Sequence, residues 1–251
     1  IMPYAEDQAM LVVRDVTRLR SLEKTRKHFV SNVSHELRTP LTVLKGYLEM
    51  TEEPPPPAMW AKAHRVMMEQ TIRMDNLVNQ LLTLSRIEAA PTVDLSHLVD
   101  MPAMLGLLEQ EARALSGESA HQIEFQVQSN LFVKGDRDQL RSAVSNLVYN
   151  AIHYTPAGRK ITVEGHKRGA MALFVVQDEG EGIAPEHLTR LTERFYRVDK
   201  ARSRHTGGSG LGLAIVKHAL SHHDAQLEIE SRVGQGSRFS FLIPGRMVVV
   251  K

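Results

Sequence analysis

The chain has 251 residues, of which 42% are hydrophobic, which suffices for one large folded domain or two ordinary ones and argues against general disorder. Its 31 basic and 29 acidic residues leave a formal net charge of +2, which does not favour a protein dedicated to nucleic acid or anionic membrane. The absence of cysteine excludes disulfides and cysteine nucleophiles, and the chain has no apolar run of the roughly 18 residues needed to cross a bilayer.

The first 17 residues contain one strand-like run, AMLVV, and no second run with which it could pair. Because a lone strand is not stable, residues 1–17 are interpreted as the trailing edge of a domain that lies upstream. The alternative is a disordered tail.

Two long amphipathic helices are predicted next, over 17–50 and from Ala63 to near Pro91. In each, apolar residues recur at steps of three and four, which places them on one face. The intervening TEEPPPPA has four consecutive prolines, which cannot continue a helix and predict a stiff turn. The helices form an antiparallel hairpin with one apolar seam, and a second copy of the chain would bury that seam in a four-helix bundle. We therefore expect a homodimer.

The stretch SHELRTPL, residues 34–41, places an ionisable pair and a proline inside the first helix. His35 lies off the apolar seam and is expected to face outward. Pro40 lacks an N–H, so the carbonyl of Glu36 loses its helical partner, and the helix is expected to bend just after the histidine. For His35 alone, a solvated polar helix face is the simpler interpretation. A zinc-protease HExxH site is excluded because Thr39 stands where the second histidine must be.

Beyond Pro91, helices alternate with strands. Helices are predicted over about 97–115, 136–154 and 209–223. Strands are predicted at HQIEFQVQ, KITVEGH, MALFVVQD, QLEIES and SRFSFLIP. Some strands follow one another as hairpins while helices separate others, so a mixed sheet covered by helices fits best. The chain thus has two modules, with a boundary near residues 90–95.

Two motifs in the second module carry candidate ligand-binding side chains. In NLVYNA, Asn146 and Asn150 are four residues apart on a helix, which places both amides on one face; an amide oxygen suits Mg²⁺ shared with phosphates. In VVQDEGEGI, a strand leads into Asp178, whose carboxylate can accept a hydrogen bond from an exocyclic amine such as that of adenine. Gly180 and Gly182 let a ligand approach the backbone. Each motif alone is a weak signal, since solvated asparagines and an ordinary Gly-rich turn explain them as well.

A third motif, TGGSGLGL, has four glycines that lead directly into an apolar helix. Backbone N–H groups at a helix N-terminus bind anions, and glycines let phosphates approach. The spacing matches neither the GxxxxGK[ST] of a P-loop nor the GxGxxG of a dinucleotide fold. The long basic loop before it, RLTERFYRVDKARSRHTGG, is typical of a functional lid or a disordered segment, and its basic residues are candidates for phosphate contacts.

Three histidines lie near the end of the last predicted helix. His218 and His222 are four residues apart and form a weak metal-ligand pair. Two ligands without a third fit a polar helix face better, and His222 and His223 are interpreted in the same way.

The order HELRTPL, NLVYNA, DEGEG, RFYR, GGSGLGL and GQGSRFSFLIP resembles the H, N, G1, F and G2 boxes and closing strands of sensor histidine kinases, from Thr17 to the end. The resemblance implies an α+β multidomain fold: an antiparallel helical hairpin that dimerises into a four-helix bundle, then an α/β-sandwich ATP-binding domain of the Bergerat (GHKL) type. It implies that residues 18–90 are the dimerisation and histidine phosphotransfer hairpin and residues 91–251 the catalytic ATP-binding domain. Residues 1–17 look like the trailing strand of a truncated PAS domain.

The resemblance also assigns roles to single residues. It makes His35 the phosphoacceptor, with Glu36 holding its proton, and it implies that Glu36 and Thr39 serve a phosphatase activity. It implies ATP and Mg²⁺ as ligands, with Asn150 at the metal. The chain departs from the family at His153, where many members carry a lysine that meets a phosphate. The residues implied to bind ATP are Asn146, Asn150, His153, Tyr154, Asp178, Gly180, Gly182, Ile183, Phe195, Arg197, Gly208, Gly210, Leu211, Gly212 and Leu213.

The implied activity is autophosphorylation on His35 and transfer of the phosphoryl group to an aspartate of a response regulator. The flanking stretches are most similar to the phosphate-regulon branch of the family, which implies a PhoB-like regulator. That likeness also implies a parent protein in the bacterial inner membrane with this portion in the cytoplasm. One alternative is a non-catalytic nucleotide-binding dimeric scaffold. Another is a GHKL ATPase, which is weakened because Asn146 stands where such enzymes place a glutamate base.

Overall fold

The computed structural model describes residues 2–5, 8–10, 15–50, 56–90, 94–198 and 208–250. The chain divides into two compact units, residues 1–71 and 72–251, each of which is described by itself. None of the helices in these described ranges is both long enough and apolar enough to span a membrane.

The first unit is dominated by the helix α1, Thr17–Glu49, which confirms the prediction for residues 17–50. Two short strands precede it, β1 (Met2–Ala5) and β2 (Gln8–Met10), which pair antiparallel. Residues 11–13 of the predicted AMLVV strand and residues 51–55 of the predicted proline turn lie outside the described residues.

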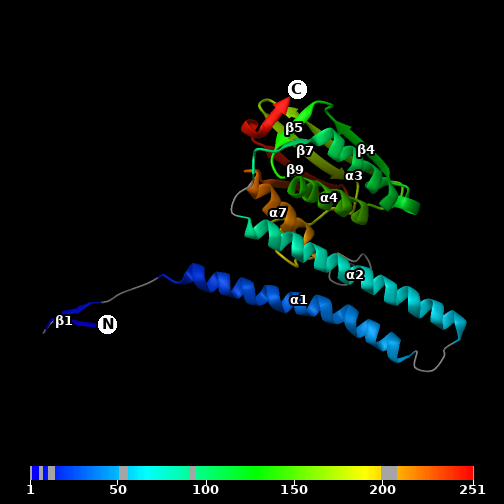
Figure 1. Ribbon diagram of the computed structural model, residues 1–251, viewed down its shortest axis with the longest axis horizontal. Helices are drawn as coiled ribbons and strands as arrows, with labels where there is room; N and C mark the ends of the chain where they lie inside the picture. The colour runs from blue at the N-terminus through cyan, green and yellow to red at the C-terminus, as the bar shows by residue number, and fades with distance from the viewer. Residues whose placement is uncertain are drawn as a thin grey trace. The chain divides into compact units, whose positions relative to one another are not determined.

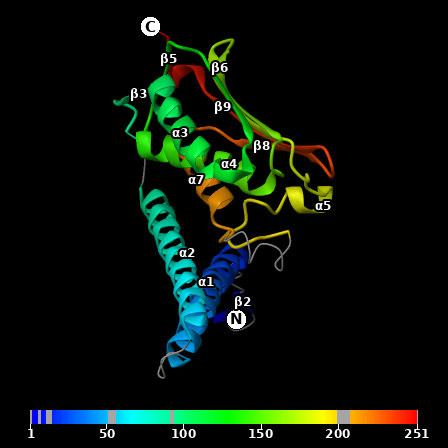
Figure 2. The ribbon, with the colours of Figure 1, turned by 90° about the vertical axis from the view of Figure 1, so that its right-hand side faces the viewer.

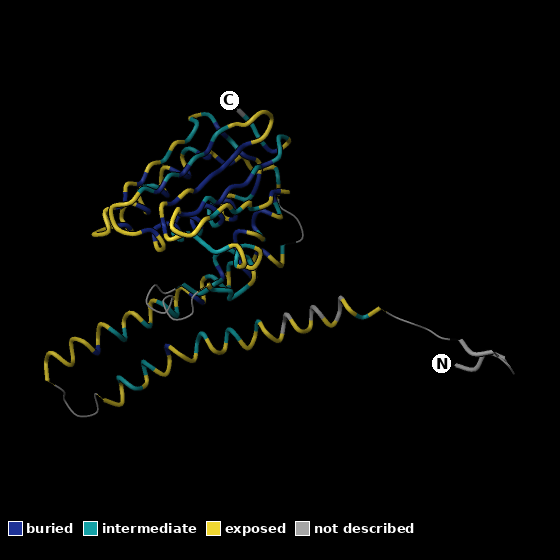
Figure 3. The backbone as a smooth tube through the Cα atoms, turned by 180° about the vertical axis from the view of Figure 1, so that it is seen from behind, coloured by how far each residue is buried: buried dark blue, intermediate teal, exposed yellow. Residues whose placement is uncertain are grey.

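The second long helix, α2 (Pro57–Ala89), is labelled in Figure 1. It begins in the first unit and ends in the second. α1 continues through Pro40 to Glu49, so the predicted bend after the histidine stays a prediction. Most described side chains of α1 are exposed or half-buried, and Pro40 is the one buried residue among them (Figure 3).

The second unit contains a five-stranded mixed sheet in the order β4-β6-β7-β9-β8. β4 runs parallel to β6, and the other neighbouring pairs are antiparallel. The strands, β4 (Gln122–Val127), β6 (Lys160–Arg168), β7 (Met171–Asp178), β8 (Leu227–Arg232) and β9 (Gly236–Ile243), lie where the alternating pattern predicts them.

Helices α3 (Met101–Ser116), α4 (Arg137–Tyr154) and α7 (Gly212–His222) lie on one side of this sheet (Figure 2). Alternate strand residues face them, and the stacked rings of Phe174 and Phe241, 5.1 Å apart, lie in this layer. Both rings are almost fully buried, and burying one such side chain stabilises the fold by about 1.5–3 kcal/mol. Three short helices are α5 (Pro185–Leu188), η1 (Gly117–Ser119) and η2 (Gly245–Met247).

A second, three-stranded sheet was not predicted. It consists of β3 (Leu98–Asp100), β5 (Leu131–Lys134) and β10 (Val248–Val250), with β5 in the centre. The helix predicted to begin near residue 97 is therefore wrong at its start. Asp100 ends β3 and caps α3, because its side chain accepts a hydrogen bond from the N–H of Ala103.

Candidate active site

The carboxylate of Asp178 is the central charged group of the candidate site. It stands at the end of β7 and is only 5% exposed. Its Oδ1 accepts hydrogen bonds from the backbone N–H groups of Gly180 (2.8 Å) and Ser237 (3.2 Å). Burial raises the pKa of Asp178, and the two N–H donors partly oppose that shift. The arrangement fixes one oxygen and leaves Oδ2 to accept from a donor such as an amine.

The glycine-containing loop after Asp178 packs against the turn between β8 and β9. A Cβ on Gly182, where φ is +71°, would overlap the carbonyl oxygen of Arg232. A Cβ on Gly180 would lie 2.6 Å from the carbonyl oxygen of Tyr154, at the end of α4. The N–H of Ile183 donates to Ser231 Oγ at 2.8 Å. The segment 180–183 packs closely against the end of α4 and the β8–β9 turn, and side chains at positions 180 and 182 would prevent this packing.

The two asparagines of NLVYNA occupy one side of α4, as predicted. The amide nitrogen of Asn146 donates to the carbonyl of Ser142 at 2.8 Å. Its Oδ1 faces the start of α7, because a Cβ on Gly212 would lie 2.7 Å from this oxygen. Asn150, one turn further on, is half-buried. Glycine at position 212 thus allows α7 to approach the asparagine face of α4.

The end of α4 borders the glycine motif. His153 and Tyr154 are both exposed, and a Cβ on Gly208 would lie 3.6 Å from the hydroxyl of Tyr154. Partial desolvation lowers the pKa of His153 from its ordinary value. At neutral pH this side chain therefore lacks the charge of a lysine at the same position.

The stretch RFYR is attached to the glycine motif through the backbone. The N–H of Phe195 donates to the carbonyl of Gly210 at 2.8 Å, and both residues have positive φ, +63° and +74°. A Cβ on Gly210 would lie 2.8 Å from the backbone of Phe195. Leu211 is fully buried and anchors the start of α7, while Arg197 and Leu213 are half-buried. Residues 199–207 of the predicted lid lie outside the described part of the chain.

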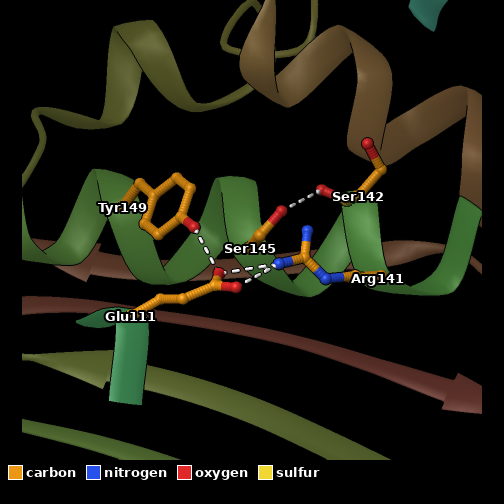
Figure 4. Close-up of polar contacts among 5 residues, drawn as sticks. All are labelled: Glu111, Arg141, Ser142, Ser145 and Tyr149. Carbon is orange, nitrogen blue, oxygen red and sulfur yellow. Dashed lines mark hydrogen bonds and ion pairs between the residues drawn. The ribbon is translucent and has the colours of Figure 1, made fainter. Parts of the chain in front are cut away.

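On another face of α4, a polar cluster joins this helix to α3 (Figure 4). Glu111 of α3 accepts two hydrogen bonds from Arg141, at 2.5 and 2.7 Å, and one from the hydroxyl of Tyr149 at 3.0 Å. Burial and the neighbouring carboxylate of Glu111 raise the pKa of Tyr149, so the phenol keeps the proton that it donates. Arg141 and Tyr149 lie two turns apart, so their shared partner Glu111 links two successive parts of α4 to α3.

The candidate phosphoacceptor, His35, is exposed on α1, as predicted. Thr39 is also exposed, and its hydroxyl donates to the carbonyl of His35 at 3.2 Å. Glu36 is half-buried. These three side chains belong to the first unit, whereas all the residues implied to bind ATP belong to the second.

Comparison with known proteins adds independent evidence. Residues 25–90 match the family model of the His Kinase A (phospho-acceptor) domain, and residues 135–247 match that of the histidine kinase-, DNA gyrase B- and HSP90-like ATPase. The chain belongs to the sensor histidine kinase family.

Two curated relatives are phosphate regulon sensor proteins PhoR. The protein from Pseudomonas aeruginosa is 47% identical over 94% of this chain, and that from Haemophilus influenzae is 44% identical over 99%. The chain spans only 54% and 58% of their lengths. Among solved structures, full-length ShkA in complex with AMPPNP superposes with a TM-score of 0.63 at 25% identity, covering 89% of this chain and 46% of that one.

Asn146 and Asn150 are the residues that could hold Mg²⁺, and the family resemblance assigns Asn150 to the metal. Neither amide oxygen of Asn146 and Asn150 accepts a hydrogen bond within the described ranges, and such hard, neutral ligands suit Mg²⁺ shared with phosphates. The predicted metal-ligand pair of His218 and His222 is not part of a metal site: Nε2 of His218 lies 3.2 Å from Oε1 of Glu88. The described residues contain no cluster of three His, Cys, Asp or Glu that could hold a metal.

Two residues that support the kinase site were not singled out from the sequence. Ser237 supplies an N–H to Asp178, and Ser231 accepts from Ile183 while donating to the carbonyl of Gly236 at 2.9 Å. Ser231 lies in the predicted strand QLEIES and Ser237 in GQGSRFSFLIP, so both were present in predicted strands without an assigned role. The interpretation of His223 as part of a polar helix face is wrong, because this residue is completely buried.

Proposed function

We propose that this chain is the catalytic part of a homodimeric, ATP- and Mg²⁺-dependent protein-histidine kinase that phosphorylates His35. Two features together support this proposal. His35 is exposed within the matched phospho-acceptor domain, and the buried carboxylate of Asp178 lies beside a glycine-rich loop. By this proposal residues 18–90 are the dimerisation and phosphotransfer hairpin, residues 91–251 are the catalytic domain, and residues 1–17 end a PAS domain.

The adenine amine would donate to Asp178 Oδ2, and the phosphates would lie between the asparagine face of α4 and the start of α7. A ring nitrogen of the exposed His35 attacks the γ-phosphorus, the bond to the β-phosphate oxygen breaks, and ADP leaves. Glu36 accepts the imidazole proton and stabilises the imidazolium that forms during attack. Mg²⁺, when bound, neutralises phosphate charge, while the protein positions the two reactants.

The next step of the proposal is transfer of the phosphoryl group to an aspartate of a response regulator. The similarity to PhoR supports a PhoB-like partner in the phosphate starvation response. Thr39, one turn from His35, would orient a water for dephosphorylation of that partner. The regulator would dock around Val43–Tyr47, so replacing Tyr47 should alter transfer without altering autophosphorylation. Unchanged transfer would contradict the docking proposal.

The test uses ATP labelled at the γ-phosphate, with Mg²⁺, on the wild type and on His35→Gln. His28→Gln is a matched control, because His28 is exposed on the same helix two turns earlier. We expect acid-labile, base-stable label in the wild type and in His28→Gln, and none in His35→Gln. Nucleotide binding without label in the wild type would instead support the non-catalytic scaffold. Release of phosphate without a phosphohistidine would support the GHKL ATPase.

A further inference from the structure

His223, the residue after the last turn of α7, is 0% exposed and uses both ring nitrogens. Nδ1 lies 2.7 Å from the carbonyl oxygen of Ala219, and Nε2 lies 3.1 Å from the backbone nitrogen of Asp136. A carbonyl only accepts and an N–H only donates, so the ring is neutral with its proton on Nδ1. His223 therefore donates to its own helix and accepts from the start of another one.

The acceptor bond reaches the cap of α4. The side chain of Asp136 caps this helix by accepting from the N–H groups of Asp138 (2.8 Å) and Gln139 (3.0 Å). The backbone N–H of Asp136 is thereby left to donate to His223. The preceding residue is Gly135, and a Cβ there would lie 2.5 Å from Cδ2 and Nε2 of the His223 ring. The absence of a side chain at position 135 therefore leaves room for the imidazole ring beside Asp136.

α4 and α7 pack against each other, and two of the points at which they meet lie near opposite ends of α7. At one end, His223 of α7 contacts Asp136 of α4. At the other, Gly212 of α7 lies against Asn146 Oδ1 of α4. The two points are about 15 Å apart along α4 and about 16 Å apart along α7, at 1.5 Å per residue. Contacts at both ends constrain the angle between the helices, so a shift at His223 would be transmitted toward the glycine motif beside Asn146.

We propose that His223 is a positioning residue for the nucleotide site: its hydrogen bond to Asp136 holds α7 and the glycine motif in place against the asparagine face of α4. This inference rests on the proposed nucleotide-binding function of that face. His223 does not touch the nucleotide and acts through the two helices. A displacement of about 1 Å in such a site is enough to weaken catalysis strongly.

The buried, neutral His223 should make the protein less stable as the pH falls. Burial lowers the pKa of His223, while the Ala219 carbonyl and the carboxylates of Asp136 and Asp224 oppose that shift and His222 adds to it. A histidine whose folded pKa is lowered stabilises fully above its ordinary pKa of about 6.5. That stabilisation is lost as the pH falls through the folded pKa, because a protonated Nε2 would face the N–H of Asp136.

Two variants separate the two hydrogen bonds. His223→Gln keeps an acceptor near the position of Nε2 and so keeps the bond from Asp136. His223→Asn keeps a donor near the position of Nδ1 and so keeps only the bond to Ala219. His222→Gln is the matched control on the neighbouring histidine. The readouts are the Kd of Mg²⁺-AMPPNP by calorimetry between pH 8 and pH 5.5, and the melting temperature.

At pH 8 we expect His223→Asn to bind AMPPNP about tenfold more weakly than the wild type, with His223→Gln and His222→Gln close to the wild type. As the pH falls, the wild-type Kd should rise relative to that of His223→Gln; this ratio cancels the titration of the nucleotide itself. Equal affinity of the Asn and Gln variants at pH 8 would overturn the inference. A wild type that binds no AMPPNP would overturn the proposed function instead.

If His223→Asn does not fold, Gly135→Ala tests the same geometry, because its Cβ displaces the ring without changing its chemistry. It should weaken AMPPNP binding by a similar factor, and unchanged binding would count against the inference. In the wild type, the Asp136 amide should exchange its hydrogen slowly; fast exchange would show that the bond to His223 is not formed in solution.

Discussion

His35 and Asp178, the two central side chains of the proposed reaction, have opposite surroundings. His35 is exposed on a single helix, and its neighbours Glu36 and Thr39 come from the same turn. Asp178 is almost fully buried, and its position depends on β7, the loop after it, the β8–β9 turn and the end of α4. A substitution at the first should change chemistry alone, whereas substitutions around the second should also change binding or stability.

The largest expected effect is that of Asp178→Asn. The amide oxygen would replace Oδ1 as the acceptor from the N–H groups of Gly180 and Ser237. This would place an NH₂ at the position of Oδ2, the proposed acceptor of the adenine amine. Two donors then face each other, and ATP affinity should fall on the order of a hundredfold.

Stability should respond differently to this substitution. Because burial raises the pKa of Asp178, its ionised form disfavours folding increasingly as the pH rises above the ordinary carboxyl pKa. The free energy of unfolding of Asp178→Asn should therefore equal or exceed that of the wild type at pH 7. Glu179→Gln, at the exposed neighbouring carboxylate, is the control. Unchanged ATP affinity in Asp178→Asn, measured by calorimetry, would remove Asp178 from the site.

Gly182→Ala tests the close packing around the loop after Asp178, and Gly234→Ala is its matched control. Both glycines have positive φ, +71° and +77°, so alanine strains the backbone at either position. Only the Cβ at position 182 would overlap another atom, the carbonyl oxygen of Arg232, whereas nothing lies within 4 Å at position 234. We expect a cost of about 1 kcal/mol for Gly234→Ala and about 3 kcal/mol for Gly182→Ala, measured by urea unfolding. Equal costs would show that the close approach is not needed.

His153→Lys tests the departure from the family pattern. A permanent charge near the phosphates should tighten ATP binding by about threefold, a small factor because the position is exposed to solvent. Since the pKa of His153 is lowered, its own charge appears only as the pH falls. The advantage of the lysine variant should therefore shrink between pH 8 and a pH well below the ordinary histidine pKa of about 6.5. A Kd that does not change at either pH would place His153 away from the phosphates.

The smallest effect is expected from Tyr149→Phe, which removes one of three hydrogen bonds to Glu111 on the outer side of α4. The cluster is partly exposed, so the free energy of unfolding should fall by less than about 1 kcal/mol, with ATP affinity unchanged. Arg141 retains its two bonds to Glu111 and still joins α3 to α4. A clear loss of ATP affinity would mean that the tyrosine controls the asparagine face directly.

The sequence predicted the parts of this molecule in which a pattern repeats over many residues. The five strands of the main sheet and the three helices on it follow from alternation and helical spacing, and Asp178 and its glycines follow from a local motif. β3, β5 and β10 have three or four residues each, too few for a periodic signal.

The supporting contacts were not predictable for a different reason. Ser237 and Asp178 are 59 residues apart, Ile183 and Ser231 are 48 apart, and Asp136 and His223 are 87 apart. Such pairs are brought together by tertiary packing, so nothing in the local sequence distinguishes the buried His223 from its half-buried neighbour His222.

The most direct test of the separation between the two regions measures phosphohistidine and the Kd of Mg²⁺-AMPPNP in the same preparations of wild type, His35→Gln and Asp178→Asn. We predict that His35→Gln binds AMPPNP like the wild type and acquires no label, and that Asp178→Asn loses both. Label on His35→Gln, or AMPPNP binding lost in it, would contradict the account.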